Sequence, residues 1–138
     1  MDLTQKTAIL ELLARSAYAL DERRMEELED TFTEDVTLVI DIAGVDGEMA
    51  FEGREALMGL MTDTMEEQLD QRRHVVTNSF FRDESDARAS VVAYVTITSV
   101  EHGAIRLVTS GVYLDEVVLE SDGQWRIASR RINLDMAY

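Results

Sequence analysis

The first half of the chain has apolar residues every three or four positions, a spacing typical of helices. Three stretches follow this pattern, and a short β-branched stretch interrupts them. The predicted helices span residues 4–22, 24–35 and 54–70, and the predicted strand spans residues 36–41. Thr4 stands where an N-cap is expected for the first helix.

The second half changes to a period of two from residue 72 onward. Four long β-type runs are separated by short turn sequences, "ESD", "HG" and "SDG", as in successive hairpins. Helices followed by hairpins predict an α+β fold: a cone-shaped, curved antiparallel or mixed sheet packed on three N-terminal helices. A sheet bent over helices leaves a space between the layers where a small molecule fits.

The length and charge of the chain narrow the possible functions. With 138 residues, 46% of them hydrophobic, we expect one soluble domain spanning residues 1–138. The formal charge of −15 would repel a polyanion, so nucleic acid and anionic membranes are excluded as partners. The acidic residues are interpreted as solvated helix faces, since no calcium-binding loop motif is present.

Several kinds of chemistry are disfavoured by what the sequence lacks. Without cysteine there are no disulfides or cysteine-ligated metals, and two distant histidines do not make a zinc site. Neither a serine-hydrolase elbow nor a phosphate-binding glycine loop occurs. There is no apolar run of about 20 residues and no basic–apolar leader at the start, so we expect a cytoplasmic protein.

Four stretches carry a resemblance to a known superfamily. They are "YALDERRMEELEDTFTEDV" (18–36), "GREAL" (53–57), "RRHVVTN" (72–78) and "DGQWRIASRRINLD" (122–135). In this order they resemble the SnoaL-like branch of the nuclear-transport-factor-2-like superfamily. That group includes polyketide cyclases, dehydratases and the non-catalytic small subunits of ring-hydroxylating dioxygenases. The resemblance implies an NTF2-like α+β barrel with a deep apolar pocket.

The resemblance also implies a catalytic pair. His74 matches a histidine on the first long strand of related dehydratases, and Asp21 matches an aspartate at the end of their first helix. Tyr18 matches a pocket tyrosine of some relatives. The chain departs from scytalone dehydratases, which carry a second catalytic histidine on the next strand; His102 lies in an apparent turn and does not replace it.

From the residues themselves, His74 has two interpretations. It is a core residue bonded to a backbone carbonyl, or a general base in a cavity, for which the ordinary imidazole pKa is well suited. On a regular strand Asn78 would share its face, and the periodicity does not say which face is inner. Asp21 either caps the next helix or orients the imidazole.

Other polar and aromatic residues are candidates for substrate contacts. Asp35 is either structural or a pocket carboxylate, and one arginine of the pair at 130 and 131 either binds a ligand or pairs with an acid. We include Arg131 in the candidate substrate site. Aromatic residues have two interpretations, core or pocket; they are Tyr94, Tyr113 and Trp125.

These observations predict a cofactor-independent and metal-free lyase, isomerase or cyclase that acts on a small, largely apolar, carbonyl-containing metabolite of the polyketide type. A donor such as Tyr18, Tyr94 or Asn78 would stabilise the enolate oxygen. Two alternatives stay open: a non-catalytic subunit or ligand-binding module, and an epoxide hydrolase with an Asp–Arg–Asp set. Excess apolar residues on the outer sheet face predict a homodimer.

Overall fold

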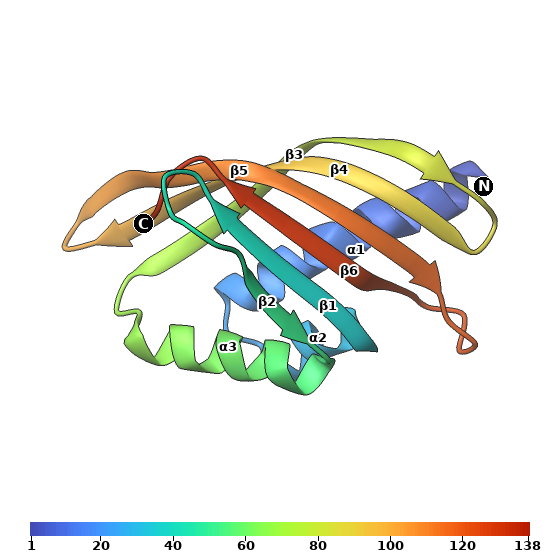
Figure 1. The fold of residues 1–138 in the computed structure, drawn as a ribbon, viewed down its shortest axis with the longest axis horizontal. Helices are drawn as coiled ribbons and strands as arrows, with labels where there is room; N and C mark the ends of the chain where they lie inside the picture. Colours follow the sequence, from blue (N-terminus) through green and yellow to red (C-terminus); the bar gives the residue numbers. More distant parts are fainter.

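The computed structural model describes all residues from 1 to 138, as three helices and six strands (Figure 1). In chain order the elements are α1 (Leu3–Asp21), α2 (Met25–Asp30), β1 (Phe32–Ile42), β2 (Met49–Glu52), α3 (Arg54–Glu67), β3 (Gln71–Glu84), β4 (Arg88–Glu101), β5 (Ala104–Leu119) and β6 (Trp125–Leu134). The predicted order of elements, with the helices first and four long strands after them, is therefore confirmed.

All six strands form one mixed sheet in the order β2-β1-β6-β5-β4-β3. Strand β1 runs parallel to β6, and every other neighbouring pair is antiparallel. The sheet curves over the helices, as Figure 1 shows, but β2 and β3 stay as free edges. The predicted α+β fold with a curved sheet on three helices is confirmed, and the sheet does not close into a barrel.

Most predicted boundaries differ from the structure by a few residues, and the third helix ends at Glu67 and not at residue 70. Two differences have a clear physical cause. The second helix ends at Asp30, and Phe32 begins β1 instead of continuing the helical stripe. Pairing with β6 explains this, because the N–H of Ile127 donates to the carbonyl of Thr31 at 2.9 Å. The N-cap of α1 is Asp2 and not Thr4, since Asp2 forms a capping box in which its carboxylate accepts the N–H of Gln5 at 2.8 Å.

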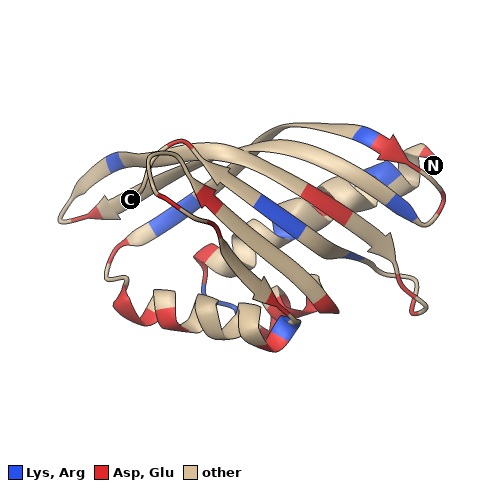
Figure 2. Cartoon of the chain, in the orientation of Figure 1, with Lys and Arg blue, Asp and Glu red and all other residues tan.

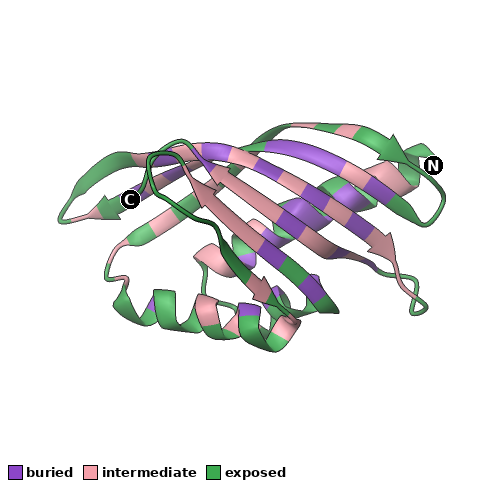
Figure 3. Ribbon diagram, in the orientation of Figure 1, coloured by how far each residue is buried: buried purple, intermediate pink, exposed green.

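The core lies between the helices and the concave face of the sheet. Burial alternates along β4, β5 and β6, as expected where one sheet face is covered (Figure 3). The most deeply buried large side chains of this core are Phe32, Ile9, Leu28, Leu38, Leu57 and Ile127. The helices therefore cover one face of the sheet, and the residues that point inward along the strands form the floor of the space beneath them.

Strand β3 contains a bulge that changes which residues face inward. Asn78 has a positive φ of 55°, and β3 has one more residue than β4 between the pairs Thr77–Tyr94 and Phe80–Val92. After the bulge, Phe81 packs on the core and Phe80 is half exposed. The regular alternation predicted from the sequence is thus interrupted at Asn78.

Gly111 is required where β5 crosses β6. A Cβ atom at this position would lie 2.3 Å from the backbone oxygen of Asn133, far inside van der Waals contact. The residue therefore allows the two strands to approach closely at the point where the sheet curves.

The surface carries the excess of acidic residues predicted from the composition. Figure 2 shows Asp and Glu on α3 and at the hairpin ends. None of the helices is long and apolar enough to cross a membrane.

Candidate active site

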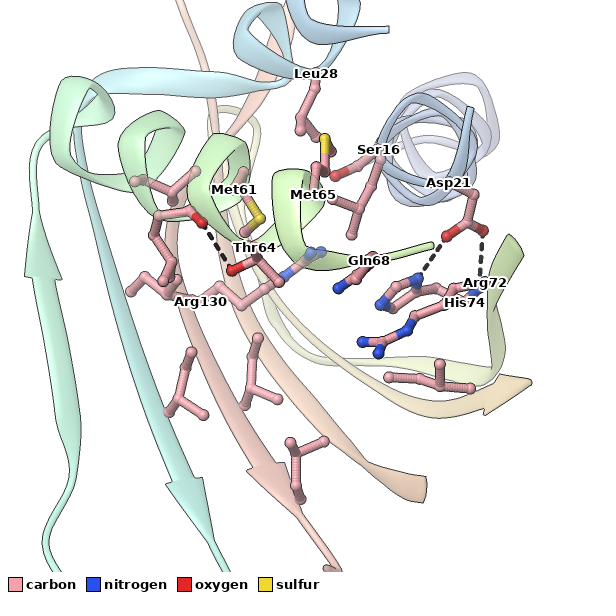
Figure 4. A pocket seen from close by; sticks show the side chains of 18 of the residues that line it. Ser16, Asp21, Leu28, Met61, Thr64, Met65, Gln68, Arg72, His74 and Arg130 are labelled. Atoms are coloured by element: carbon pink, nitrogen blue, oxygen red, sulfur yellow. Dashed lines mark hydrogen bonds and ion pairs between the residues drawn. The ribbon is translucent and has the colours of Figure 1, made fainter. Parts of the chain in front are cut away.

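A cavity of about 270 Å³ lies between the helices and the concave face of the sheet. Sixteen of its 25 lining residues are hydrophobic, so the environment is largely apolar. Inward-facing side chains of β1, β3, β4, β5 and β6 form one side, and α1, α2 and α3 form the other. Figure 4 shows polar side chains pointing into this space from several elements.

Asp21 and His74 meet at the wall of this cavity. The Nδ1 atom of His74 lies 2.5 Å from Oδ1 of Asp21, and the backbone N–H of His74 donates to Oδ2 at 2.8 Å. Both side chains are well buried, with 5% of Asp21 and 11% of His74 exposed. A carboxylate only accepts hydrogen bonds, so Nδ1 carries a proton and Nε2 is the free ring nitrogen. That nitrogen points away from Asp21 into the cavity (Figure 4).

Asp21 is held at the last position of α1 by a sharp helix end. Arg23 has a positive φ of 57°, and the N–H of Arg24 donates to the carbonyl of Ala19 at 2.8 Å. A carboxylate at a helix C-terminus is disfavoured by the helix dipole. The two hydrogen bonds from His74 offset this cost, so the helix end and β3 fix one another.

A second polar group lines the cavity on the same side. The carboxylate of Asp70 accepts hydrogen bonds from the hydroxyl of Ser99 and from Nε of Arg72, the latter at 3.1 Å. The Ser99 hydroxyl, together with Arg72, lowers the pKa of Asp70, although burial acts in the opposite direction. Arg72 also lies over the ring of Tyr138, 4.9 Å from its centroid. The charges of Asp70 and Arg72 therefore compensate one another.

A third polar group consists of Arg130, Asp115 and Tyr113. Arg130 donates to both carboxylate oxygens of Asp115 at 2.8 Å, and its guanidinium stacks over the Tyr113 ring at 4.1 Å. Burial alone would lower the pKa of Arg130, but attraction and hydrogen bonding by Asp115 outweigh burial and keep it above its usual value. Burial raises the pKa of Tyr113 to about 12, although Arg130 acts against this. Arg130 is therefore charged and Tyr113 neutral.

Three predicted substrate contacts lie outside the cavity. Tyr18 is half exposed and lies in a separate surface groove. Ser16 faces the cavity, and Tyr18 follows it by two residues on the helix, which turns its side chain by about 200° to the opposite side of α1. Asn78 is exposed because the bulge in β3 removes it from the face of His74. Tyr94 is half exposed on the outer sheet face, since inward positions on β4 alternate with it.

The remaining three are also placed elsewhere. Asp35 is exposed, and Trp125 belongs to the hydrophobic core and borders the surface groove rather than the cavity. Arg131 points outward and pairs with Glu48 at 2.7 Å, whereas its neighbour Arg130 faces inward. The Asp–Arg–Asp set considered for an epoxide hydrolase is therefore not assembled with Asp35, and the inward arginine is paired with Asp115.

Sequence reasoning missed most of the polar lining. Ser16, Thr64, Gln68 and Asp70 line the cavity but were not candidates, and Tyr113 had two interpretations, core or pocket. Arg72 lies two residues before His74 and therefore on the same face of the strand. This spacing is the one signal in the sequence that could have identified Arg72 as a cavity residue. Within the structure, no cluster of three or more His, Asp or Glu side chains is arranged to hold a metal ion.

A curved sheet that covers an apolar cavity together with helices defines the NTF2-like class of domains. A family model described as the SnoaL-like domain matches residues 1–131, so the chain belongs to the SnoaL-like family. No curated protein matches the sequence significantly.

Many solved structures share this fold. A candidate scytalone dehydratase from Novosphingobium aromaticivorans is 25% identical, with a TM-score of 0.78 over 97% of this chain and 86% of that chain. ActVI-ORFA from Streptomyces coelicolor is 22% identical, with a TM-score of 0.80 over 95% and 98%. The β subunit of a candidate aromatic-ring-hydroxylating dioxygenase from N. aromaticivorans is 20% identical, with a TM-score of 0.82 over 99% and 94%. The latter two likenesses establish the fold alone.

Proposed function

We propose that this protein is a cofactor-independent lyase, isomerase or cyclase that acts by proton transfer on a small carbonyl compound. The observation that carries the proposal is the His74–Asp21 pair in a largely apolar cavity. The family resemblance favoured these two residues, and in the structure their side chains lie within hydrogen-bonding distance. In this role His74 is the general base and acid, and Asp21 orients it.

The proposed chemistry follows from the direction of the hydrogen bond. Asp21 holds the proton on Nδ1, which leaves the lone pair of Nε2 facing the cavity. Nε2 accepts a proton from the carbon next to a carbonyl group, and the electrons of that C–H bond move toward the carbonyl oxygen. The imidazolium then returns the proton to another carbon or to a departing hydroxyl group. Asp21 stabilises the imidazolium between these steps.

The size and relatives of the site support a small, polyketide-like substrate. The volume of about 270 Å³ lies just below the usual range of ligand cavities, about 300–1,000 Å³, so the substrate is expected to be small. The SnoaL-like family and the neighbouring candidate scytalone dehydratase support a dehydration or cyclisation. The alternative of a non-catalytic oxygenase subunit draws on the fold alone.

Exchange of α-protons in heavy water tests the proposal without knowledge of the natural substrate. With 2-tetralone as the probe, followed by NMR, we expect the protein to accelerate exchange and His74→Asn to slow it by about 10²–10⁴-fold. His102→Asn is the matched control, because His102 is exposed in a turn, outside the cavity. Equal exchange rates for His74→Asn and the unchanged protein would contradict the proposed role of His74.

We also propose that the protein forms a homodimer through the outer face of the sheet. Apolar side chains of β3, β4 and β5 are exposed together on that face: Val75, Phe80, Tyr94, Val100, Ile105 and Leu107. Sedimentation equilibrium is expected to give twice the chain mass, and Leu107→Glu is expected to give the monomer. Leu107 is 70% exposed in the single chain, so this substitution does not disturb the core. A monomeric unchanged protein would refute the proposal.

A further inference from the structure

Arg130 and Tyr113 have hydrogen-bond donors that no protein group uses. Asp115 accepts only from Nε and Nη2 of Arg130, which leaves the Nη1 amino group without an acceptor. No hydrogen bond engages the Tyr113 hydroxyl either. Only two side-chain atoms of the chain are both buried and without a hydrogen-bond partner, Oγ1 of Thr33 and Oδ1 of Asn133. Nη1 of Arg130 and the Tyr113 hydroxyl also lack a partner but are not among these buried atoms. Because Arg130 and Tyr113 both line the cavity, these two donors are accessible from it.

These donors lie close to one another and apart from His74. The guanidinium covers the face of the Tyr113 ring, so its free edge and the phenol hydroxyl belong to one small region of the wall. Strand β4 separates β3, which carries His74, from β5, which carries Tyr113. The register also displaces Tyr113 along the sheet, because His74 is level with Thr109, four residues before Tyr113; the two backbones are therefore about 10 Å apart across the strands and about 13 Å apart along them. Both side chains line the cavity, so a ring-sized ligand would have to span the space between their polar atoms. Figure 4 shows Arg130 extending into the same cavity that His74 borders.

The charges of the lining residues are compensated within the protein. Asp115 neutralises Arg130, and Asp70 neutralises Arg72. An anionic group of a ligand at Nη1 of Arg130 would therefore gain little, because the adjacent Asp115 carboxylate already compensates the positive charge of the guanidinium. The hydroxyl of Tyr113 is protonated at neutral pH, since burial raises its pKa to about 12. The region thus offers neutral and charge-compensated donors in an apolar space, which suits an uncharged oxygen acceptor.

We propose that Tyr113 and Arg130 together bind the carbonyl or phenolic oxygen of an uncharged, ring-sized substrate. The substrate class follows from the same contacts: a neutral cyclic ketone or phenol, and not a carboxylate, phosphate or amine. The catalytic consequence rests on the proposed function of His74. When Nε2 of His74 removes the α-proton, the C–H electrons form the carbon–carbon double bond of an enolate and the carbonyl π electrons move onto this oxygen. The hydroxyl and the guanidinium edge then stabilise the developing negative charge.

Binding of three matched probes tests the oxygen site directly. The probes are 2-naphthol, naphthalene, which lacks the oxygen, and 2-naphthoate, which adds a charge; dissociation constants come from fluorescence titration. We expect 2-naphthol to bind about tenfold more tightly than naphthalene, and 2-naphthoate to bind more weakly than 2-naphthol. Tyr113→Phe should weaken 2-naphthol binding about fivefold to tenfold and leave naphthalene binding within twofold. Tyr18→Phe, in the surface groove outside the cavity, is the matched control and should change neither.

Three results would overturn the inference. They are no measurable binding of 2-naphthol, tighter binding of 2-naphthoate than of 2-naphthol, and unchanged 2-naphthol binding in Tyr113→Phe. Arg130→Lys gives a second test, since it keeps the positive charge beside Asp115 but removes the guanidinium edge; it too should weaken 2-naphthol more than naphthalene. His74→Asn separates this inference from the proposed function. If 2-naphthol binding depends on Tyr113 but the protein exchanges no 2-tetralone protons, the oxygen site stands and proton transfer by His74 fails.

Discussion

The buried pair of Arg130 and Asp115 allows a quantitative test of how the cavity wall is stabilised. The Asp115 side chain is 1% exposed, that of Arg130 is 9% exposed, and the hydrogen bonds to Arg130 are the only ones that the Asp115 carboxylate makes. Arg130→Met would leave a carboxylate buried without a partner. Breaking a buried pair in this way costs about 3–5 kcal/mol, whereas replacing both members by apolar residues is often neutral.

The expected values follow from that difference. Arg130→Met should lower the free energy of unfolding by about 3–5 kcal/mol, which for a chain of this size lowers the Tm by about 10 °C or more. The double variant Arg130→Met/Asp115→Leu should recover most of the loss. Since domains of this kind are stable by about 5–15 kcal/mol, the single variant is expected to fold at low temperature. Urea unfolding followed by circular dichroism measures all three proteins.

The neighbouring residue provides a matched control. Arg131 follows Arg130 on β6 but pairs with Glu48 at the surface, where ion pairs contribute about 0–1 kcal/mol. Arg131→Met is therefore expected to change the stability by less than about 1 kcal/mol. If Arg130→Met costs no more than Arg131→Met, water in the cavity solvates Asp115 and the reasoning about desolvation is refuted. If the double variant is as unstable as the single variant, the loss comes from packing and not from the unpaired carboxylate.

Three further predictions concern the frame around the site. Gly111→Ala should destabilise the protein by about 1–3 kcal/mol or more in urea unfolding, because its Cβ would clash with the backbone oxygen of Asn133; an unchanged midpoint would contradict this. Asp2→Ala should cost about 1 kcal/mol through loss of the capping box, measured in the same way, and Asp2→Asn should cost less. The Ser99 hydroxyl lowers the pKa of Asp70 in the folded protein, so ionised Asp70 stabilises the fold at pH values above its unfolded pKa of about 3.9. This stabilisation disappears as the pH falls through the pKa of Asp70 in the folded protein. In Asp70→Asn, the loss of stability below about pH 4 should therefore be less steep than in the unchanged protein.

The sequence specified the elements well because their periods are clear. The change from helical spacing to alternation near residue 72 coincides with the start of β3 at Gln71, and the short turns between the later strands are hairpins. The parallel pairing of β1 with β6 could not be predicted from the sequence, because it joins segments almost one hundred residues apart. That pairing also explains why the second helix ends earlier than its apolar stripe suggested.

The candidate site was predictable only in part. His74 and Asp21 were found through a family resemblance, and no local pattern would have placed a helix end against a strand fifty residues later. Asn78 was misplaced because one bulge reverses the alternation after it. Arg130 and Arg131 are adjacent and chemically identical in the sequence, so only the register of β6 decides which one faces inward.

The polar lining of the cavity is also the strongest argument against a purely structural role. A core that only supported a partner subunit would gain stability from apolar side chains, since each buried polar group costs free energy unless it is hydrogen-bonded. This cavity instead retains the free Nε2 of His74, the hydroxyl of Tyr113 and one edge of Arg130, all within a largely apolar lining. Hydrogen bonds to Asp21 hold His74 in place from behind, and an ion pair with Asp115 holds Arg130. Donors and acceptors that face the cavity without a protein partner add nothing to the stability of the fold, and a ligand with complementary polar atoms would satisfy them.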